Sequence, residues 1–203
     1  MVNIMPNTAT QSNVKNIMIV GVGGQGTLLA SKLMGKAFVE KGFDVKVSEV
    51  HGMSQRGGSV VTYVRYGDKV YSSLVEKGEA DIIIAFEQLE AARWLPYLKP
   101  DGILITSSQA IDPMPVVMGT AEYPQGILPA IREMGVRVMD ADALTLALEA
   151  GSARATNVVL LGLAAHYLGF DKEMWVDVIR TTVPPKTIAV NEKAFELGYA
   201  AIR

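Results

Sequence analysis

A run of glycines near the amino terminus has the residue types and spacing of a phosphate-binding loop. The apolar run 16–20 leads into Gly-Val-Gly-Gly-Gln-Gly-Thr, which contains G-x-G-x-x-G, and a helical pattern follows at once. Glycines permit a tight turn and close approach of the backbone to a ligand, and free N–H groups at a helix start favour an anion. The predicted ligand-binding residues are Gly21, Gly23, Gly24, Gln25, Gly26 and Thr27. The alternative is that the loop is only the tight crossover that the fold needs.

A second polar loop, from His51 to Gly58, offers an imidazole, a hydroxyl, an amide and a guanidinium. A loop that leaves the carboxyl end of a parallel strand faces the same crevice as the glycine loop. We therefore predict that Ser54, Gln55 and Arg56 also bind the ligand, with Arg56 holding a phosphate or a carboxylate. It is equally consistent with the sequence that this loop makes subunit contacts or caps neighbouring carbonyls.

The glycine loop is also compatible with a dinucleotide. In that case an acidic residue about 20 residues further on, at the end of the second strand, binds the ribose hydroxyls. Glu49 stands near that place, although it is equally well explained as a solvated strand residue. A free-standing protein that binds NAD or another nucleotide, such as an NAD-dependent dehydrogenase, therefore remains the alternative hypothesis.

Composition limits the chemistry that the chain can perform. It has 203 residues and no cysteine, which excludes disulfides, thiolate zinc sites, iron–sulfur clusters held by this chain and a cysteine nucleophile. No Ser-His-Asp arrangement, carboxylate pair or metal-ligand cluster is recognisable, so we predict neither catalytic residues nor a metal site. His166 lies in an apolar helical pattern, which predicts a hydrogen-bonded histidine in the core or an interface.

Charge and hydropathy indicate the kind of partner. The net charge is −2 and the basic residues are scattered, so no nucleic-acid partner is expected. The longest apolar stretch, 158–168, is too short to span a bilayer, and we expect a soluble cytoplasmic protein. Residues 1–15 are polar and are expected to form a flexible terminus, followed by a single domain over 16–203.

The hydrophobic periodicity predicts the elements that carry these loops. Strand 16–20, the glycine loop, helix 26–42 and strand 44–50 are expected to form a βαβ unit with a parallel pair. Alternating runs 59–66 and 69–75 around Gly67-Asp68 predict an antiparallel hairpin. Strands are expected at 81–86, 103–107 and 136–140, a short extended piece at 116–118, a turn at 99–102, and helices at 87–98, 130–134, 141–150, 155–168, 172–181 and 189–200. The predicted fold is α/β and Rossmann-like, a mostly parallel sheet with an inserted antiparallel β-hairpin and a helical C-terminal tail.

Three motifs together resemble a known family. They are the glycine loop, the twelve-residue string from Ser48 to Ser59, and the late Asn157 with Pro184-Pro185-Lys186. This combination resembles the gamma-type domain of the 2-oxoacid:ferredoxin oxidoreductases over about residues 16–200, and the contiguous string is the specific part of the likeness.

The resemblance implies a subunit of a complex that decarboxylates a 2-oxoacid, in particular an aryl pyruvate such as indolepyruvate, to acyl-CoA and CO2. It further implies that thiamine diphosphate, Mg²⁺ and 4Fe–4S clusters lie on a large partner subunit that serves ferredoxin. This chain is then the non-redox member of a hetero-oligomer and is not catalytic alone. The gamma-type domain is associated with coenzyme A binding and assembly, and the phosphates of coenzyme A suit the glycine loop and Arg56.

Overall fold

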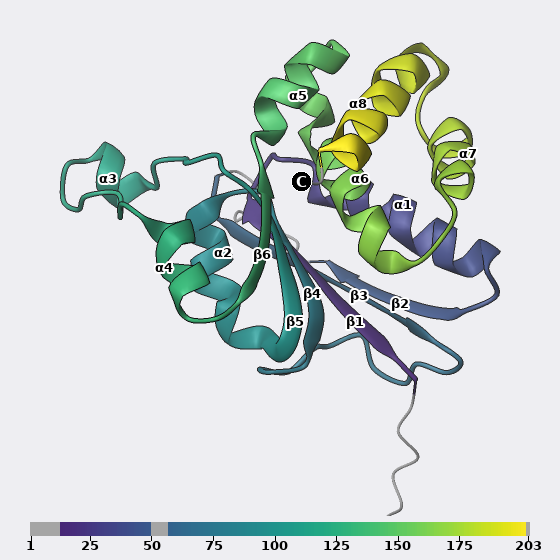
Figure 1. Ribbon diagram of the computed structural model, residues 1–203, viewed down its shortest axis with the longest axis horizontal. Helices are drawn as coiled ribbons and strands as arrows, with labels where there is room; N and C mark the ends of the chain where they lie inside the picture. The colour runs from purple at the N-terminus through teal and green to yellow at the C-terminus, as the bar shows by residue number, and fades with distance from the viewer. Residues whose placement is uncertain (1–12, 50–56, 202–203) are drawn as a thin grey trace, which may run out of the picture.

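A six-stranded sheet separates two layers of helices in the computed structural model, which describes residues 13–49 and 57–201 (Figure 1). The strands are β1 (Lys15–Val22), β2 (Asp44–Glu49), β3 (Ser59–Gly67), β4 (Ala80–Ala85), β5 (Leu98–Ser107) and β6 (Arg137–Ala141). The α-helices are α1 (Thr27–Glu40), α2 (Gln88–Trp94), α3 (Met114–Val117), α4 (Ile127–Glu133), α5 (Ala143–Ala150), α6 (Thr156–Leu168), α7 (Lys172–Thr182) and α8 (Ile188–Ala200). Short 3₁₀ helices η2 (Leu95–Tyr97), η3 (Ala153–Ala155) and η4 (Pro185–Thr187) adjoin α2, α6 and α8.

The strand order is β2-β3-β1-β4-β5-β6, and every strand except β3 runs in the same direction. The predicted fold class is therefore confirmed, whereas the predicted pairing of β1 with β2 is wrong. β3 lies between them and pairs antiparallel with β1 from Lys15↔Tyr66 to Val22↔Ser59. An antiparallel return needs only a short connection, so the strand that follows β2 can occupy the place beside β1 that a simple βαβ unit gives to β2.

The antiparallel hairpin lies earlier in the chain than predicted. Its strands are β2 and β3, and 69–75 is not a strand. Side chains bind the backbone of that segment instead: Asp44 accepts a hydrogen bond from the amide of Val70 at 2.9 Å, and Arg65 donates to the carbonyls of Ser72 and Leu74. The Val70 amide and then Lys46 lower the pKa of Asp44. Because these side chains satisfy the backbone, no strand ladder is needed there.

Two further local predictions are wrong. The segment 116–118 belongs to a helical turn, α3 and its cap, and is not extended. The predicted turn at 99–102 lies inside β5, where the register shifts between Ala80↔Leu98 and Ile82↔Ile103. The extra residues of β5 bulge out of the ladder there, which explains why turn-forming Pro and Gly occur within a strand.

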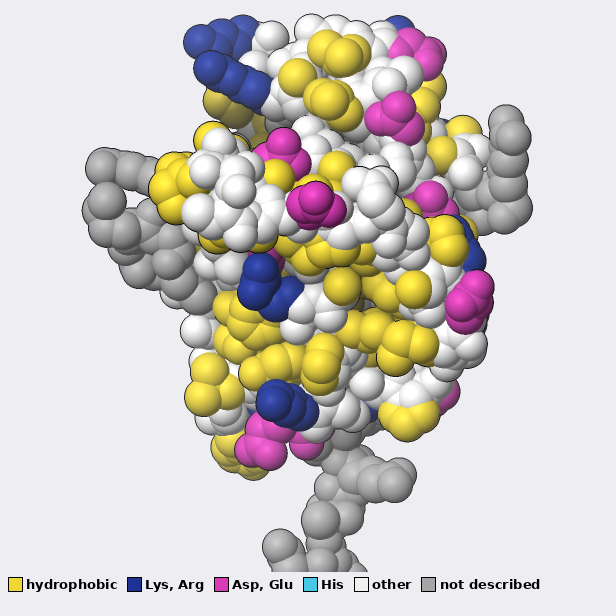
Figure 2. Space-filling view, turned by 90° about the vertical axis from the view of Figure 1, so that its left-hand side faces the viewer, with side chains coloured by type: hydrophobic (Ala, Val, Ile, Leu, Met, Phe, Trp, Pro, Cys, Tyr) yellow, Lys and Arg dark blue, Asp and Glu magenta, His cyan; other side chains and the backbone are white. Residues whose placement is uncertain are grey.

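The thinner layer consists of α2 and α4 packed on one face of the sheet. Its core is small and includes Met18, Ile83 and Leu104. Figure 2 shows hydrophobic side chains gathered over this face. Between α2, η2 and α4 an open apolar groove of about 780 Å³ has Leu95, Ile131 and the exposed Met134 among its lining residues.

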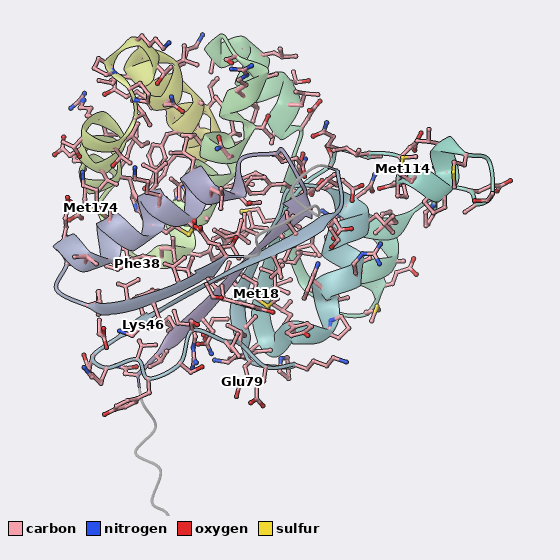
Figure 3. All side chains as sticks on the ribbon, turned by 180° about the vertical axis from the view of Figure 1, so that it is seen from behind. Met18, Phe38, Lys46, Glu79, Met114 and Met174 are labelled. Atoms are coloured by element: carbon pink, nitrogen blue, oxygen red, sulfur yellow. The ribbon has the colours of Figure 1, made fainter. Side chains whose placement is uncertain are left out.

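The connection from β5 to α4 extends away from both layers. It carries α3, which projects from the body beside α4, and Met114 lies on this projection (Figures 1 and 3). The rest of the chain between Ser107 and Ile127 contains no other helix or strand. A connection of this length without a core of its own is unusual in a small domain.

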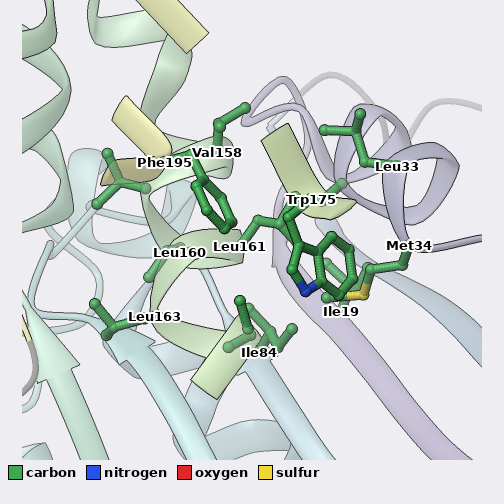
Figure 4. Packing of buried hydrophobic residues seen from close by; sticks show 14 of the residues in the cluster. Ile19, Leu33, Met34, Ile84, Val158, Leu160, Leu161, Leu163, Trp175 and Phe195 are labelled. Carbon is green, nitrogen blue, oxygen red and sulfur yellow. The ribbon is translucent and has the colours of Figure 1, made fainter. Parts of the chain in front are cut away.

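The thicker layer packs α1 and α5 to α8 on the other face of the sheet and holds the main core. Trp175, Phe195 and Leu161 are fully or almost fully buried there among Val158, Leu33 and Ile84 (Figure 4). Phe38 of α1 stacks on Tyr66 of β3 with ring centroids 3.9 Å apart. Burial raises the pKa of Tyr66 to about 12. None of the helices in the described part of the chain is long and apolar enough to cross a membrane.

Two glycines allow α6 and α8 to cross in close contact. A Cβ atom on Gly198 would stand 2.0 Å from the carbonyl oxygen of Val159, and one on Gly162 would stand 2.3 Å from that of Phe195. Such distances are far below van der Waals contact, so any side chain would push the two helices apart. The packing of the C-terminal helices against the core therefore depends on these glycines.

We expect Gly198→Ala to lower the free energy of unfolding by about 1 to 3 kcal/mol, because overpacking outweighs the better helix propensity of alanine. Gly35→Ala in α1 is the matched control, since its Cβ would meet only Val47 at an ordinary 3.7 Å. It should leave stability unchanged or raise it by up to about 1 kcal/mol. Urea unfolding of both variants measures the difference, and equal stabilities would contradict close packing at this crossing.

Candidate ligand-binding site

The glycine loop connects the end of β1 to the start of α1, as the sequence predicts. Gly24 has φ 101° and Gly26 has φ 87°, both in the left-handed region that side chains rarely adopt. Gly26 is the N-cap of α1, and no side chain caps the helix. The strand, the glycine turn and the helix start therefore follow one another in the order that anion-binding loops use.

Gln25 holds the loop together from inside. Its side-chain oxygen accepts a hydrogen bond from the amide of Val22 at 2.7 Å, and its side-chain nitrogen donates to the carbonyl of Phe86 at 3.1 Å. A Cβ on Gly21 would stand 2.8 Å from that oxygen, so the glycine makes room for the glutamine. Gln25 was predicted as a ligand contact, but both ends of its amide serve the loop itself.

Asn157, at the start of α6, supports the loop from the thicker layer. It is buried, and its side-chain nitrogen donates to the carbonyl of Gly26 at 3.0 Å while its side-chain oxygen accepts from the amide of Val158. A Cβ on Gly26 would stand 2.6 Å from this nitrogen. The sequence identified Asn157 only as part of a motif, and the structure shows that its side chain supports the glycine loop at Gly26.

The two predicted loops meet at their ends. The amide of Gly23 donates to the carbonyl of Gly58 at 2.8 Å, and the amide of Gly57 donates to the carbonyl of Gly23 at 3.3 Å. These bonds extend the β1–β3 ladder beyond Val22 and Ser59. The structure thus confirms that the two loops leave the same edge of the sheet, whereas Ser54, Gln55 and Arg56 lie outside the described residues.

The backbone amides of Gly24, Thr27 and Leu28 have no acceptor among the described residues. They belong to the loop and the first turn of α1, where no acidic side chain occurs. A cavity of about 260 Å³ lies beside them, lined by these three residues and by Val60 and Thr62 of β3, among others. Uncompensated N–H groups and the positive end of a helix favour an anionic group in this cavity.

Glu49 does not occupy the position that a dinucleotide needs. β3 separates β2 from β1, so Glu49 lies two strands away from the glycine loop, about 10 Å in the direction of the sheet hydrogen bonds. Its carboxylate accepts a hydrogen bond from the hydroxyl of Ser31 at 2.8 Å. In a Rossmann dinucleotide site the acidic strand is the neighbour of the glycine-loop strand. The inserted β3 therefore weakens the NAD hypothesis.

Two buried glutamates on the other side of the loop were missed by the sequence interpretation. Glu87 is the N-cap of α2 and is only 1% exposed; it accepts hydrogen bonds from the amides of Glu90 and Ile111 and from the hydroxyl of Tyr123. Burial and this glutamate raise the pKa of Tyr123. Glu87 was predicted as an ordinary first residue of a helix, and only its capping position could have indicated a special role.

Glu90, which is 5% exposed, binds Ser59 at the end of the second loop. Its carboxylate accepts hydrogen bonds from the hydroxyl of Ser59, from the indole of Trp94 and from the guanidinium of Arg93. A cavity of about 220 Å³ lies here, with Val22, Gly58, Ser59 and both glutamates among its lining residues. Buried carboxylates disfavour a phosphate on this side, so an anion fits the cavity beside α1 better.

Two other residues considered from the sequence lie elsewhere. His166 is exposed; its ring stacks on Tyr199, and its Nε2 atom lies 2.8 Å from the Tyr199 carbonyl oxygen. It is hydrogen-bonded as predicted but lies at the surface and not in the core. Lys186 is exposed in η4, between α7 and α8, and has no ion pair among those that the structure describes.

The fold and the loop define a Rossmann-like α/β protein with a glycine loop between β1 and α1. Comparison with known proteins gives the family: the model of the pyruvate ferredoxin/flavodoxin oxidoreductase family matches residues 16–201, and the chain belongs to this family. It is similar to the indolepyruvate oxidoreductase subunit IorB of Thermococcus kodakarensis, with 48% identity over 93% of this chain and 96% of that protein. The resemblance inferred from the sequence motifs is confirmed.

Solved structures agree with the fold. The gamma subunit of the keto/oxoacid ferredoxin oxidoreductase of Geobacter sulfurreducens matches 92% of this chain and 97% of its own, with 24% identity and a TM-score of 0.69. The 2-oxoglutarate:ferredoxin oxidoreductase of Magnetococcus marinus, determined with 2-oxoglutarate, coenzyme A and succinyl-CoA bound, matches 93% of this chain but only 31% of its own, with 21% identity and a TM-score of 0.71. In that protein the same fold is one part of a longer chain.

Gln25→Ala should lower the free energy of unfolding by about 1 to 3 kcal/mol, because the amide of Val22 and the carbonyl of Phe86 both lose their partner. Gln125→Ala, which removes an exposed side chain with one bond to Tyr123, should change stability by less than about 0.5 kcal/mol. Thermal unfolding of the two variants measures the difference in their stabilities. If Gln25→Ala is as stable as the control, the internal role of this glutamine is wrong.

Proposed function

We propose that this chain is the coenzyme A-positioning subunit of a 2-oxoacid:ferredoxin oxidoreductase, with indolepyruvate or another aryl pyruvate as the substrate of the complex. The observation that carries the proposal is the uncapped N-terminus of α1, where residues whose amides have no acceptor among the described residues line a cavity beside the glycine loop. Membership of the family and the likeness to IorB support the choice of reaction and substrate. The Magnetococcus structure, which holds coenzyme A, supports the choice of ligand.

The proposed contacts follow from the chemistry of coenzyme A. Its pyrophosphate accepts hydrogen bonds from the amides of Gly24, Thr27 and Leu28, with the helix dipole adding to the attraction. The cavity of about 260 Å³ is large enough for a diphosphate, and the rest of the ligand is proposed to extend outside it toward the partner. Arg56 is proposed to hold a further phosphate through its guanidinium.

The role of the chain in this proposal is to position the thiol of coenzyme A. Decarboxylation and electron transfer take place on the large subunit, which is proposed to carry thiamine diphosphate, Mg²⁺ and 4Fe–4S clusters and to pass electrons to ferredoxin. This chain has no cysteine with which to hold a cluster. Holding the phosphates fixes where the thiol can reach, which makes acyl transfer effectively intramolecular.

Replacement of Leu28 by glutamate tests the anion site without harming the helix. Leu28 is 44% exposed in the first turn of α1 and lines the cavity. An acid at this position stabilises the helix by about 0.3 to 1 kcal/mol but repels a phosphate. In the complex of this chain with its large subunit, we expect Leu28→Glu to raise the KM for coenzyme A at least tenfold.

Leu28→Gln is the matched control, because the glutamine side chain has nearly the shape of the glutamate side chain but carries no charge. It should leave the KM for coenzyme A within about threefold of the wild type, a change of less than about 0.7 kcal/mol. Equal KM values for the two variants would contradict a phosphate beside α1. Tight binding of NADH by the isolated chain, lost in Glu49→Ala, would favour the dinucleotide alternative.

A further inference from the structure

A projecting arm, residues 108–126, carries exposed apolar side chains at its tip. In this α3 arm Met114, Val117 and Met118 are 63%, 65% and 64% exposed, although all three belong to one helical turn or its cap. The arm has no core of its own and stands away from both layers (Figures 1 and 3). Three apolar side chains clustered on a projection indicate a surface that a partner covers.

The arm is presented in a fixed position and is not a loose loop. Glu87 accepts hydrogen bonds from Ile111 on the outgoing side of the arm and from Tyr123 on the returning side. The amide of Ser108 donates to the carbonyl of Ala141 at 3.0 Å, and the amide of Gln88 donates to the carbonyl of Gln109 at 3.1 Å. A buried carboxylate that holds both sides of the arm reduces the entropy that docking would cost.

The base of the arm borders the glycine loop. Ile111 and Pro113 line the same cavity as Val22 and Gly58, which are the ends of β1 and of the second loop. A partner seated on the arm would therefore lie beside the carboxyl end of β1, from which the glycine loop starts. The apolar groove beside Met134 is different, since its other walls include Lys99 and Gly102 near the opposite ends of the strands.

The charge of the arm indicates the chemistry of its partner surface. Its only charged residues are Asp112 and Glu122, which are both exposed, and it contains neither lysine nor arginine. A complementary surface is an apolar socket with basic residues at its rim. A second copy of this chain would bring two acidic arms together if it docked arm to arm, and like charges disfavour that contact.

We propose that the α3 arm docks into an apolar, basic-rimmed socket on the large subunit of the oxidoreductase. The inference rests on the proposed function as far as it requires that subunit. It adds the surface by which the two chains meet. Relatives such as IorB are subunits of oxidoreductases, so another chain of the complex is the occupant that the charge of the arm favours over a second copy.

Photocrosslinking tests the proposal directly, because the chain has no cysteine of its own. Met118→Cys, labelled with a benzophenone maleimide before mixing with the purified large subunit, should crosslink to that subunit on illumination. The control is Tyr71→Cys, since Tyr71 is 88% exposed and follows the end of β3 that lies beside Lys15, at the far edge of the sheet. We expect at least a tenfold higher crosslinked fraction for position 118 than for position 71.

A binding measurement separates docking from mere proximity. The double variant Val117→Asp with Met118→Asp should weaken the affinity for the large subunit at least tenfold, while its circular dichroism and Tm stay those of the wild type. Tyr71→Asp should bind within twofold of the wild type. If the wild-type chain forms a complex and the arm variant binds equally well, or if crosslinking is equal at the two positions, the docking role of the arm is overturned. If the wild-type chain forms no complex, the proposed function fails as well.

Discussion

β1 is hydrogen-bonded to a neighbouring strand on each of its two sides, and this pairing fixes where the glycine loop and the other strands lie. β1 pairs antiparallel with β3 and parallel with β4, and its carboxyl end becomes the glycine loop. Because β3 runs antiparallel along the whole of β1, the end of the second loop meets the glycine loop through the bonds between Gly23 and Gly57 or Gly58. The same insertion displaces β2 and Glu49, so the fold favours an anion at the loop over a complete dinucleotide at the neighbouring strand.

The loop itself is preorganised by groups that do not face the ligand. Gln25 joins β1 to the end of β4, and Asn157 joins the start of α6 to Gly26, so the sheet and the thicker helix layer together fix the shape of the loop. The amides of Gly24, Thr27 and Leu28 remain available because the internal bonds are made by side chains and carbonyls. An anion that binds there meets donors already in place, and little reorganisation is needed.

Sequence reasoning predicted the strand, loop and helix at residues 15–40 and the helical C-terminal tail well, because long periodic patterns such as Leu33–Ala37 or Val158–Leu168 determine their own burial. It could not predict that β3 would separate β1 from β2, since the order of strands in a sheet depends on long-range pairing and not on the pattern of any one strand. It also could not predict that the side chain of Gln25 bonds to Val22 and Phe86, because residue type does not tell which way a side chain points. Glu87 and the α3 arm were missed for a similar reason: one acts through distant backbone groups, and the other is defined by its exposure.

In the proposed function, the glycine loop and the first turn of α1 hold the phosphates of coenzyme A within an oxidoreductase complex. Hydrogen–deuterium exchange of the complex with and without coenzyme A measures this directly, because the amides of Gly24, Thr27 and Leu28 would become hydrogen-bonded donors on binding. The proposed function predicts strong protection of the peptide that spans these residues, with no change in the peptide that spans β2. Turnover with coenzyme A saturating and no protection at the loop would contradict it.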